Sequence, residues 1–170
     1  MKVRAITANV LACALLATAV LGFITIERDR AASRPAPEAE VTRYRVDYAL
    51  RKAKARQRFL MIEFGADWCE DCQALARDLQ SSEARDYFQD HFEFLNIDIG
   101  HSDRNFEAAD TLGVDLSQGI PAVVLFAPDG TRIGATNHGE LEPARRYNPQ
   151  QILDFLQAVV EHRIVINPAI

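Results

Sequence analysis

The chain has 170 residues, of which 48% are hydrophobic and 25% are charged, and this composition is typical of a globular protein and excludes disorder throughout. Its formal net charge of −5 argues against a nucleic-acid-binding protein, because neutralising phosphates requires concentrated Lys and Arg. The expected partner is therefore a protein or a small molecule.

The first predicted element is an uncharged apolar segment over residues 5–26, after a basic start that contains Lys2 and Arg4. A span of about 20 apolar residues crosses a bilayer, whereas a cleavable signal has an apolar core of about 7–15 residues. We therefore expect an uncleaved signal-anchor in residues 1–26, with the rest of the chain exported, because short basic flanks stay in the cytoplasm. The competing interpretation is a signal peptide cleaved after the small residues at 17–19.

Residues 27–42 change abruptly to charged residues, Ala and Pro. Such a segment buries too little apolar surface to offset its chain entropy, so it is predicted to be a semi-rigid linker. The folded domain is expected over residues 43–170, and its first element is an amphipathic helix over residues 44–56. The apolar residues that repeat there with helical spacing are Val46, Ala49, Leu50 and Ala53.

The remaining elements of the domain alternate between strands and helices. Strands are predicted at 59–64, 92–99, 122–126 and 131–135, and helices at 69–80, 82–90, 104–112 and around 152–159. The sequence Ala-Pro-Asp-Gly at 127–130 has strong turn chemistry, so the last two strands are expected to run antiparallel. This order predicts an α/β domain with a central mixed β-sheet flanked by helices.

The candidate site is the segment FGADWCEDC at 64–72, where Cys69 and Cys72 stand three positions apart at the start of a predicted helix. Unpaired N–H groups and the helix dipole stabilise negative charge at Cys69, which lowers the pKa of its thiol. Cys69 is therefore the predicted nucleophile, with an exposed and activated sulfur. Cys72, one turn further on the apolar side, is shielded but close enough to close a disulfide.

Other uses of two cysteines at this spacing remain open. A structural zinc site normally has four ligands, and the chain has no second Cys-x-x-Cys and no His residues at ligand spacing, so no metal ligand is assigned. A c-type haem attachment would place His directly after Cys72, where the chain has Gln73. Two inert core thiols or a permanent structural disulfide are disfavoured, because the domain is expected to be exported and such a disulfide closes only a short loop.

The motif WCEDC at 68–72 after an apolar strand, with GIP at 119–121 before another strand, resembles the thioredoxin superfamily over most of the predicted domain. The resemblance implies a thioredoxin fold and a thiol-disulfide oxidoreductase with the two cysteines as its redox-active centre and no cofactor. It also implies that Pro121 is a cis-proline facing the disulfide. Trp68, Ile120 and Pro121 would then form the substrate-binding surface, with the Ile120 backbone pairing with an extended substrate segment.

Glu63 is the candidate proton acceptor for Cys72. A carboxylate inside an apolar strand is costly unless it has a partner, and burial raises its pKa toward the range that is useful for moving a proton. The resemblance implies the same role, because Glu63 matches the buried acid beneath the active site, although that acid is usually Asp. The competing interpretation is a Glu that points to water from an edge strand.

Glu70 and Asp71 stand between the cysteines, where thioredoxin itself has Gly-Pro. A carboxylate near the Cys69 sulfur opposes the helix dipole, and each is expected to raise the pKa of the thiol by about 0.5–2. A less stabilised thiolate makes the disulfide relatively more stable, so redox tuning by these two residues favours a reductant over a strong oxidant. The competing interpretation is that acidic residues simply suit a helix start.

Taken together, these features predict an extracytoplasmic thiol-disulfide oxidoreductase that reduces disulfides of substrate proteins and receives electrons from an upstream thiol donor. GELE at 139–142 and YNP at 147–149 also resemble bacterial exported thioredoxin-like proteins. The expected location is therefore the bacterial inner membrane, held through residues 5–26, with the domain facing the periplasm or the cell exterior. Signal cleavage would instead release it. The alternatives are a non-catalytic thioredoxin-fold module that binds a partner or a metal in the cell envelope, and a disulfide isomerase.

Overall fold

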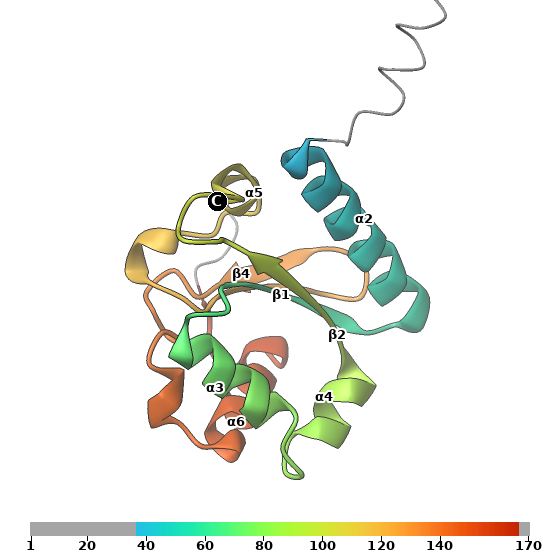
Figure 1. Cartoon of the computed structure of the whole chain (residues 1–170). Coiled ribbons are helices and arrows are strands. Elements are labelled where there is room, and N and C mark those ends of the chain that lie inside the picture. The colour runs from blue at the N-terminus through green and yellow to red at the C-terminus, as the bar shows by residue number, and fades with distance from the viewer. Residues whose placement is uncertain (1–36, 167–170) are drawn as a thin grey trace, which may run out of the picture. The chain divides into compact units, whose positions relative to one another are not determined.

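A four-stranded mixed β-sheet organises residues 37–166, the part of the chain that the computed structural model describes (Figure 1). The strands are β1 (Phe59–Gly65), β2 (Phe92–Asp98), β3 (Ala122–Phe126) and β4 (Arg132–Ala135). The α-helices are α2 (Glu38–Arg56), α3 (Glu70–Leu79), α4 (Arg85–His91), α5 (Phe106–Thr111) and α6 (Pro149–Val160). Two short 3-10 helices complete the set, η1 (Leu116–Gln118) and η2 (Ala144–Arg146).

The strand order in the sheet is β2-β1-β3-β4. β1 runs parallel to β2, with Glu63 opposite Asn96, and antiparallel to β3, with Glu63 opposite Val123. β4 returns antiparallel beside β3 after the turn at 127–130, so the predicted mixed sheet and hairpin are confirmed. β1 is therefore an inner strand, as its nearly continuous apolar sequence indicates, and it carries Glu63 into the interior.

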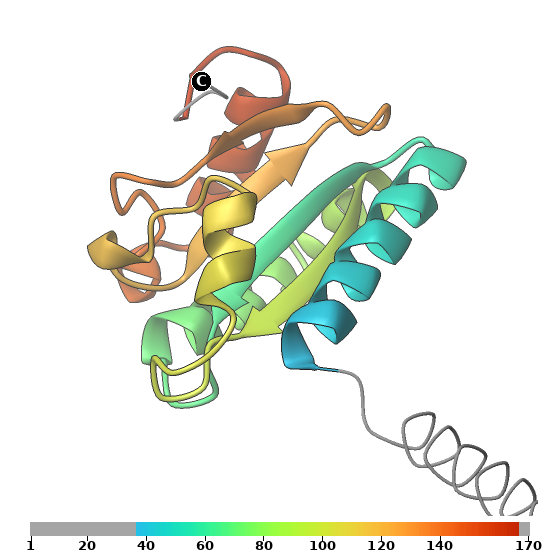
Figure 2. The ribbon, with the colours of Figure 1, turned by 90° about the horizontal axis from the view of Figure 1, so that it is seen from above.

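Helices cover both faces of the sheet. α2 and α5 lie on one face, and α3, α4 and α6 lie on the other (Figures 1 and 2). Because successive side chains of a strand point to opposite faces, Leu60 and Ile62 of β1 pack in the layer of α2. Met61 packs with Leu75 of α3 and Leu156 of α6. Glu63, two residues after Met61, points to this second layer, beneath the start of α3.

Helix α2 begins at Glu38, before the predicted start at residue 44. Its first turn carries Glu38 and Glu40, whose charges favour the positive end of the helix dipole. Thr42 is buried and donates a hydrogen bond to Asn105 Oδ1 at 2.8 Å. The last residues of the predicted linker are therefore helical, and the contact that fixes them comes from a part of the chain far away in sequence.

Helix α6 begins at a capping box. The Asn148 side chain accepts the backbone N–H of Gln151, and the Gln151 side chain accepts the backbone N–H of Asn148, each at 2.9 Å. Pro149 occupies the first helical position, where it has no N–H to leave unpaired. These local signals explain why the chain turns from the loop after β4 into a helix at this point.

The signal-anchor or signal peptide predicted for residues 1–26, and most of the linker predicted for 27–42, lie outside the described residues. Among residues 37–166, none of the helices combines the length and the apolar character needed to span a bilayer. The folded part of the described chain starts with α2 at Glu38, and the predicted domain bounds of 43–170 stay a prediction.

Candidate active site

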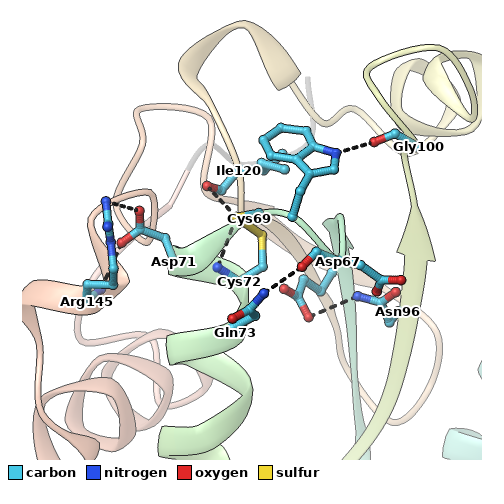
Figure 3. The surroundings of a disulfide bond; sticks show 11 residues. Asp67, Cys69, Asp71, Cys72, Gln73, Asn96, Gly100, Ile120 and Arg145 are labelled. Atoms are coloured by element: carbon cyan, nitrogen blue, oxygen red, sulfur yellow. Dashed lines mark hydrogen bonds and ion pairs between the residues drawn. A yellow bond between two sulfur atoms is a disulfide. The ribbon is translucent and has the colours of Figure 1, made fainter.

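Cys69 and Cys72 form a disulfide at the start of α3 (Figure 3). Cys69 is the N-cap of the helix, with an extended backbone, and its Sγ accepts the backbone N–H of Cys72 at 3.0 Å. The predicted helix start is therefore confirmed. In the reduced protein a Cys69 thiolate would meet this N–H group and the positive end of the helix dipole, both of which stabilise its charge.

Both cysteines of the disulfide are buried, each with 6% of its surface exposed. The prediction of an exposed Cys69 sulfur is wrong for this oxidised form. The Ile120 carbonyl oxygen lies 3.5 Å from Cys69 Sγ, although the two residues are 51 positions apart in sequence. A pattern of neighbouring residues could not show that this distant segment covers the sulfur.

The segment that covers Cys69 contains a cis peptide bond between Ile120 and Pro121, so the cis-proline prediction is confirmed. Gly119 has φ of 103°, a conformation that favours glycine. A Cβ at Gly119 would also lie only 2.8 Å from Glu142 Cγ. The segment is therefore held between Cys69 on one side and the loop after β4 on the other.

Trp68 adjoins the disulfide and has 51% of its surface exposed. Its indole Nε1 donates a hydrogen bond to the Gly100 carbonyl at 2.7 Å, which ties the ring to the loop after β2 (Figure 3). The apolar ring remains open to solvent next to Cys69, as a docking surface requires. The substrate-binding role of Trp68, Ile120 and Pro121 stays a prediction.

Glu63 is 2% exposed, so the interpretation of a carboxylate that points to water is wrong. Burial raises the pKa of Glu63 to about 7, and the hydrogen bond that Asn96 Nδ2 donates to Oε2 at 3.3 Å offsets part of this effect. Within residues 37–166, Oε1 of Glu63 is buried without a hydrogen-bond partner. A carboxyl group with these properties can hold or accept a proton near neutral pH.

Gly65 leaves room between Glu63 and Cys72. A Cβ at this position would lie 3.0 Å from Glu63 Oε1 and 3.3 Å from Cys72 Sγ, so both atoms border the same small space. The φ of Gly65 is not positive, and the backbone therefore does not require glycine there. The missing side chain keeps open the path along which a proton could pass from Cys72 to Glu63.

Arg145 of η2 binds both acidic residues that stand between the cysteines. Figure 3 shows its contact with Asp71. Its guanidinium pairs with Glu70 Oε2 and with Asp71 Oδ2, the latter at 3.2 Å, and its backbone N–H donates to Asp71 Oδ1 at 2.9 Å. Burial raises the pKa of Asp71, but the contacts with Arg145 outweigh it and hold this pKa below its usual value. The redox-tuning prediction treated the two carboxylates as free, whereas they are ion-paired.

Sequence analysis missed Arg145 and Asn96 as members of the site. A polar residue inside the strand sequence FEFLNID was the only signal for Asn96, and its partner became visible only from the register of β1 and β2. No signal pointed to Arg145, which is 74 residues from Asp71. Over the described part of the chain, no group of three or more His, Cys, Asp or Glu side chains is arranged to hold a metal ion.

The family model and the solved structures that match this chain are thioredoxin-like. A family model described as thioredoxin-like matches residues 41–128. The crystal structure of a disulphide isomerase from Xylella fastidiosa Temecula1 is 36% identical, with a TM-score of 0.65, over 75% of this chain and 95% of that chain. The structure of a DsbH oxidoreductase shares the fold, with 18% identity and a TM-score of 0.51, over 66% of this chain and 79% of that chain. None of the curated proteins matches the chain.

Proposed function

Because this chain belongs to the thioredoxin-like family and its Cys-x-x-Cys pair forms a disulfide, we propose that it is an extracytoplasmic thiol-disulfide oxidoreductase that reduces disulfides in substrate proteins. The observation that carries the proposal is the position of Cys69, at the N-cap of α3 and next to the cis-Pro121 segment. At this position the helix N-terminus stabilises a thiolate, and the backbone of the neighbouring cis-Pro121 segment can pair with an extended substrate chain.

In the reducing direction, the Cys69 thiolate attacks one sulfur of the substrate disulfide. The substrate S–S bond breaks, the second substrate sulfur leaves as a thiolate and takes up a proton, and a mixed disulfide forms. Cys72 then gives up its proton and attacks Cys69 Sγ, which breaks the mixed disulfide and releases the first substrate sulfur as a thiolate that takes up a proton. The substrate gains two electrons and the enzyme loses two, so a thiol donor must reduce the enzyme for another turnover.

Glu63 is the proposed acceptor of the Cys72 proton. Its free Oε1 borders the same space as Cys72 Sγ, and its pKa of about 7 lets it be ionised at the pH of the reaction. Glu63 Oε1 and Cys72 Sγ face each other across the space that Gly65 leaves open. The extra methylene of Glu relative to the usual Asp, together with the missing side chain at Gly65, supports this assignment.

The proposed trap for this mechanism is Cys72→Ala. With the resolving thiol removed, the Cys69 mixed disulfide cannot be released from within the protein, so adducts with a disulfide-bonded model protein such as insulin are expected to accumulate. They are detected as a mass increase that dithiothreitol reverses. The matched control is the double variant Cys69→Ala/Cys72→Ala, which should form none. A folded Cys72→Ala protein without adducts would reject the oxidoreductase in favour of a non-catalytic binding module.

A disulfide isomerase is the second candidate, because the relative that is 36% identical is described as one. An isomerase reshuffles wrong disulfides in a scrambled protein without net reduction, whereas a reductase consumes donor electrons in proportion to the bonds that it opens. If the protein restores the activity of scrambled ribonuclease while the total thiol concentration stays constant, the result would favour an isomerase over a reductase. The proposed reducing direction draws its support from Glu70 and Asp71 after Cys69, which leave about one negative charge there once Arg145 is counted.

Attachment to the bacterial inner membrane through residues 5–26 is also part of the proposal, supported by the length of that apolar segment. The full-length protein is expected to sediment with membranes and to be digested by protease added outside spheroplasts. Recovery of a shortened chain in the soluble periplasmic fraction would support signal cleavage instead.

A further inference from the structure

The helix η2 brings a distant part of the chain to the start of α3. It lies in the loop between β4 and α6, and Arg145 at its centre contacts Asp71 and Glu70, which are 74 and 75 residues away in sequence. Two residues of this loop are anchored in the core, Leu141 with 1% exposure and Ala144 with 0%. The position of Arg145 is therefore fixed by buried neighbours and by its backbone bond to Asp71, as well as by its ion pairs.

The charges that Arg145 meets are those next to the reactive sulfur. Glu70 and Asp71 are the first two residues of α3, directly after the N-cap Cys69. Two carboxylates there oppose the formation of a thiolate, and one guanidinium in contact with both offsets about one of the two negative charges. The Arg145 charge thus acts on the same thiolate that the helix N-terminus stabilises.

Other charged groups face the same region. Glu142 and Arg146, of opposite sign, line with Asp71, Pro143 and Arg145 a cavity of about 240 Å³ beside the start of α3. Glu63 lies in the interior beneath it. Among these groups, Arg145 is the cation for which the structure gives direct contacts with the two acids of the Cys-x-x-Cys motif.

We propose that Arg145 is a tuning residue that raises the reduction potential of the Cys69–Cys72 pair by offsetting the carboxylates of Glu70 and Asp71. This inference rests on the proposed function and deepens it. With Arg145 in place, the thiolate and hence the reduced form are more stable. Without it, the two carboxylates act on the sulfur uncompensated, the thiol pKa rises, and the disulfide becomes relatively more stable.

The test compares Arg145→Met, which keeps bulk without charge, with Arg145→Lys, which keeps the charge. The dithiol–disulfide equilibrium of each is measured at pH 7 against glutathione, and the pKa of the Cys69 thiol is measured by the ultraviolet absorbance of the thiolate. Arg145→Met is expected to shift the equilibrium about threefold to tenfold toward the disulfide, equivalent to a potential about 15–30 mV more negative. The pKa of its Cys69 thiol should rise, and Arg145→Lys should stay within about twofold of the native equilibrium.

Two further variants keep the inference falsifiable. Arg77→Gln removes one positive charge from the last turn of the same helix and should leave the potential unchanged. Glu70→Gln/Asp71→Asn removes the charges that Arg145 offsets, and it should lower the thiol pKa and make the potential less negative, even if the Arg145 variants fold poorly. Equal shifts in the Met and Lys variants would indicate a loop-holding role and overturn the inference, as would no shift in Glu70→Gln/Asp71→Asn.

These measurements use the full chain and glutathione, without a substrate protein. Failure of the tuning role would therefore leave the Cys72→Ala trap unaffected, and failure of the trap would leave the measured potential unaffected.

Discussion

Replacing Cys69 by Ser is expected to abolish the reduction of substrate disulfides, with a loss of at least about a thousandfold in turnover. A hydroxyl at the N-cap can still accept the Cys72 N–H, so the helix start survives, but it supplies no thiolate at neutral pH. Turnover is measured with insulin and dithiothreitol as the electron donor. Unlike a substitution at Cys72, this one should also prevent the mixed disulfide from forming, because the first bond to substrate forms only at this sulfur.

The control for Cys69→Ser is its stability relative to reduced wild-type protein, since both lack the disulfide. The two should unfold at similar urea concentrations, because Ser also suits the N-cap position. The variant Cys72→Ser keeps Cys69 and should still form the first mixed disulfide, although it does not turn over. Turnover near the wild-type level in Cys69→Ser would contradict the assignment of the nucleophile.

Glu63→Gln is expected to slow the resolution of the mixed disulfide by Cys72, about 100-fold at pH 8. With a pKa of about 7, Glu63 is mostly ionised at pH 8 and can accept the Cys72 proton, whereas an amide cannot. Below about pH 6 Glu63 is protonated, so the difference between wild type and variant should shrink. A rapid-quench measurement of the second step over this pH range checks the prediction. An equal defect at pH 6 and pH 8 would indicate a structural effect.

The same substitution is expected to change how the stability of the oxidised protein depends on pH. The pKa of Glu63 is about 7 in the folded protein and has its usual value of 4.5 when the chain unfolds. Between these values the folded state binds more protons than the unfolded state, so stability falls as the pH rises through the window and levels off above it. The full decrease is about 3 kcal/mol, and Glu63→Gln should lack it, as urea denaturation at pH 5 and pH 8 would show.

Glu93 offers a matched control, because it is also buried, with 6% exposure, but is ion-paired with three cations. The cations are Lys52, Arg56 and Arg58. Burial raises the pKa of Glu93, but its contacts with Lys52 and Arg56 outweigh this effect and leave the pKa lowered. The stability from this group is present above its unfolded pKa and is lost only below the window of Glu63. Glu93→Gln should therefore destabilise the protein similarly at pH 5 and pH 8, and a wild-type pH slope in Glu63→Gln would contradict the assignment.

The sheet and the cysteine pair could be predicted because they depend on short-range patterns. β1 and β3 are apolar runs with clear boundaries, and the turn at 127–130 fixes the direction of β4. Cys69 at the start of a helix needs only the sequence around it, and its position there is confirmed. The cis bond before Pro121 was predicted from the resemblance, because the dipeptide alone does not specify it.

The rest of the site depends on contacts between distant segments. Asn96 lies opposite Glu63 because of the parallel register of β1 and β2. The two strand sequences are compatible with many other registers, so this contact could not be predicted from them. Arg145 reaches Asp71 only after the loop between β4 and α6 packs against α3. The cover that Ile120 provides for Cys69 has the same origin. For these residues the side-chain type can be read from the sequence, but the neighbours that give it a role cannot.

The placement of Trp68 has an experimental consequence. It is the single tryptophan of the chain, it adjoins Cys69, and its indole is tethered to the Gly100 carbonyl while half of the residue faces solvent. All indole emission from the protein therefore originates beside the redox pair, where an adjacent disulfide quenches excited indole and a bound chain would shield it from water. Oxidation, reduction and docking can thus be followed in unlabelled protein by its own fluorescence.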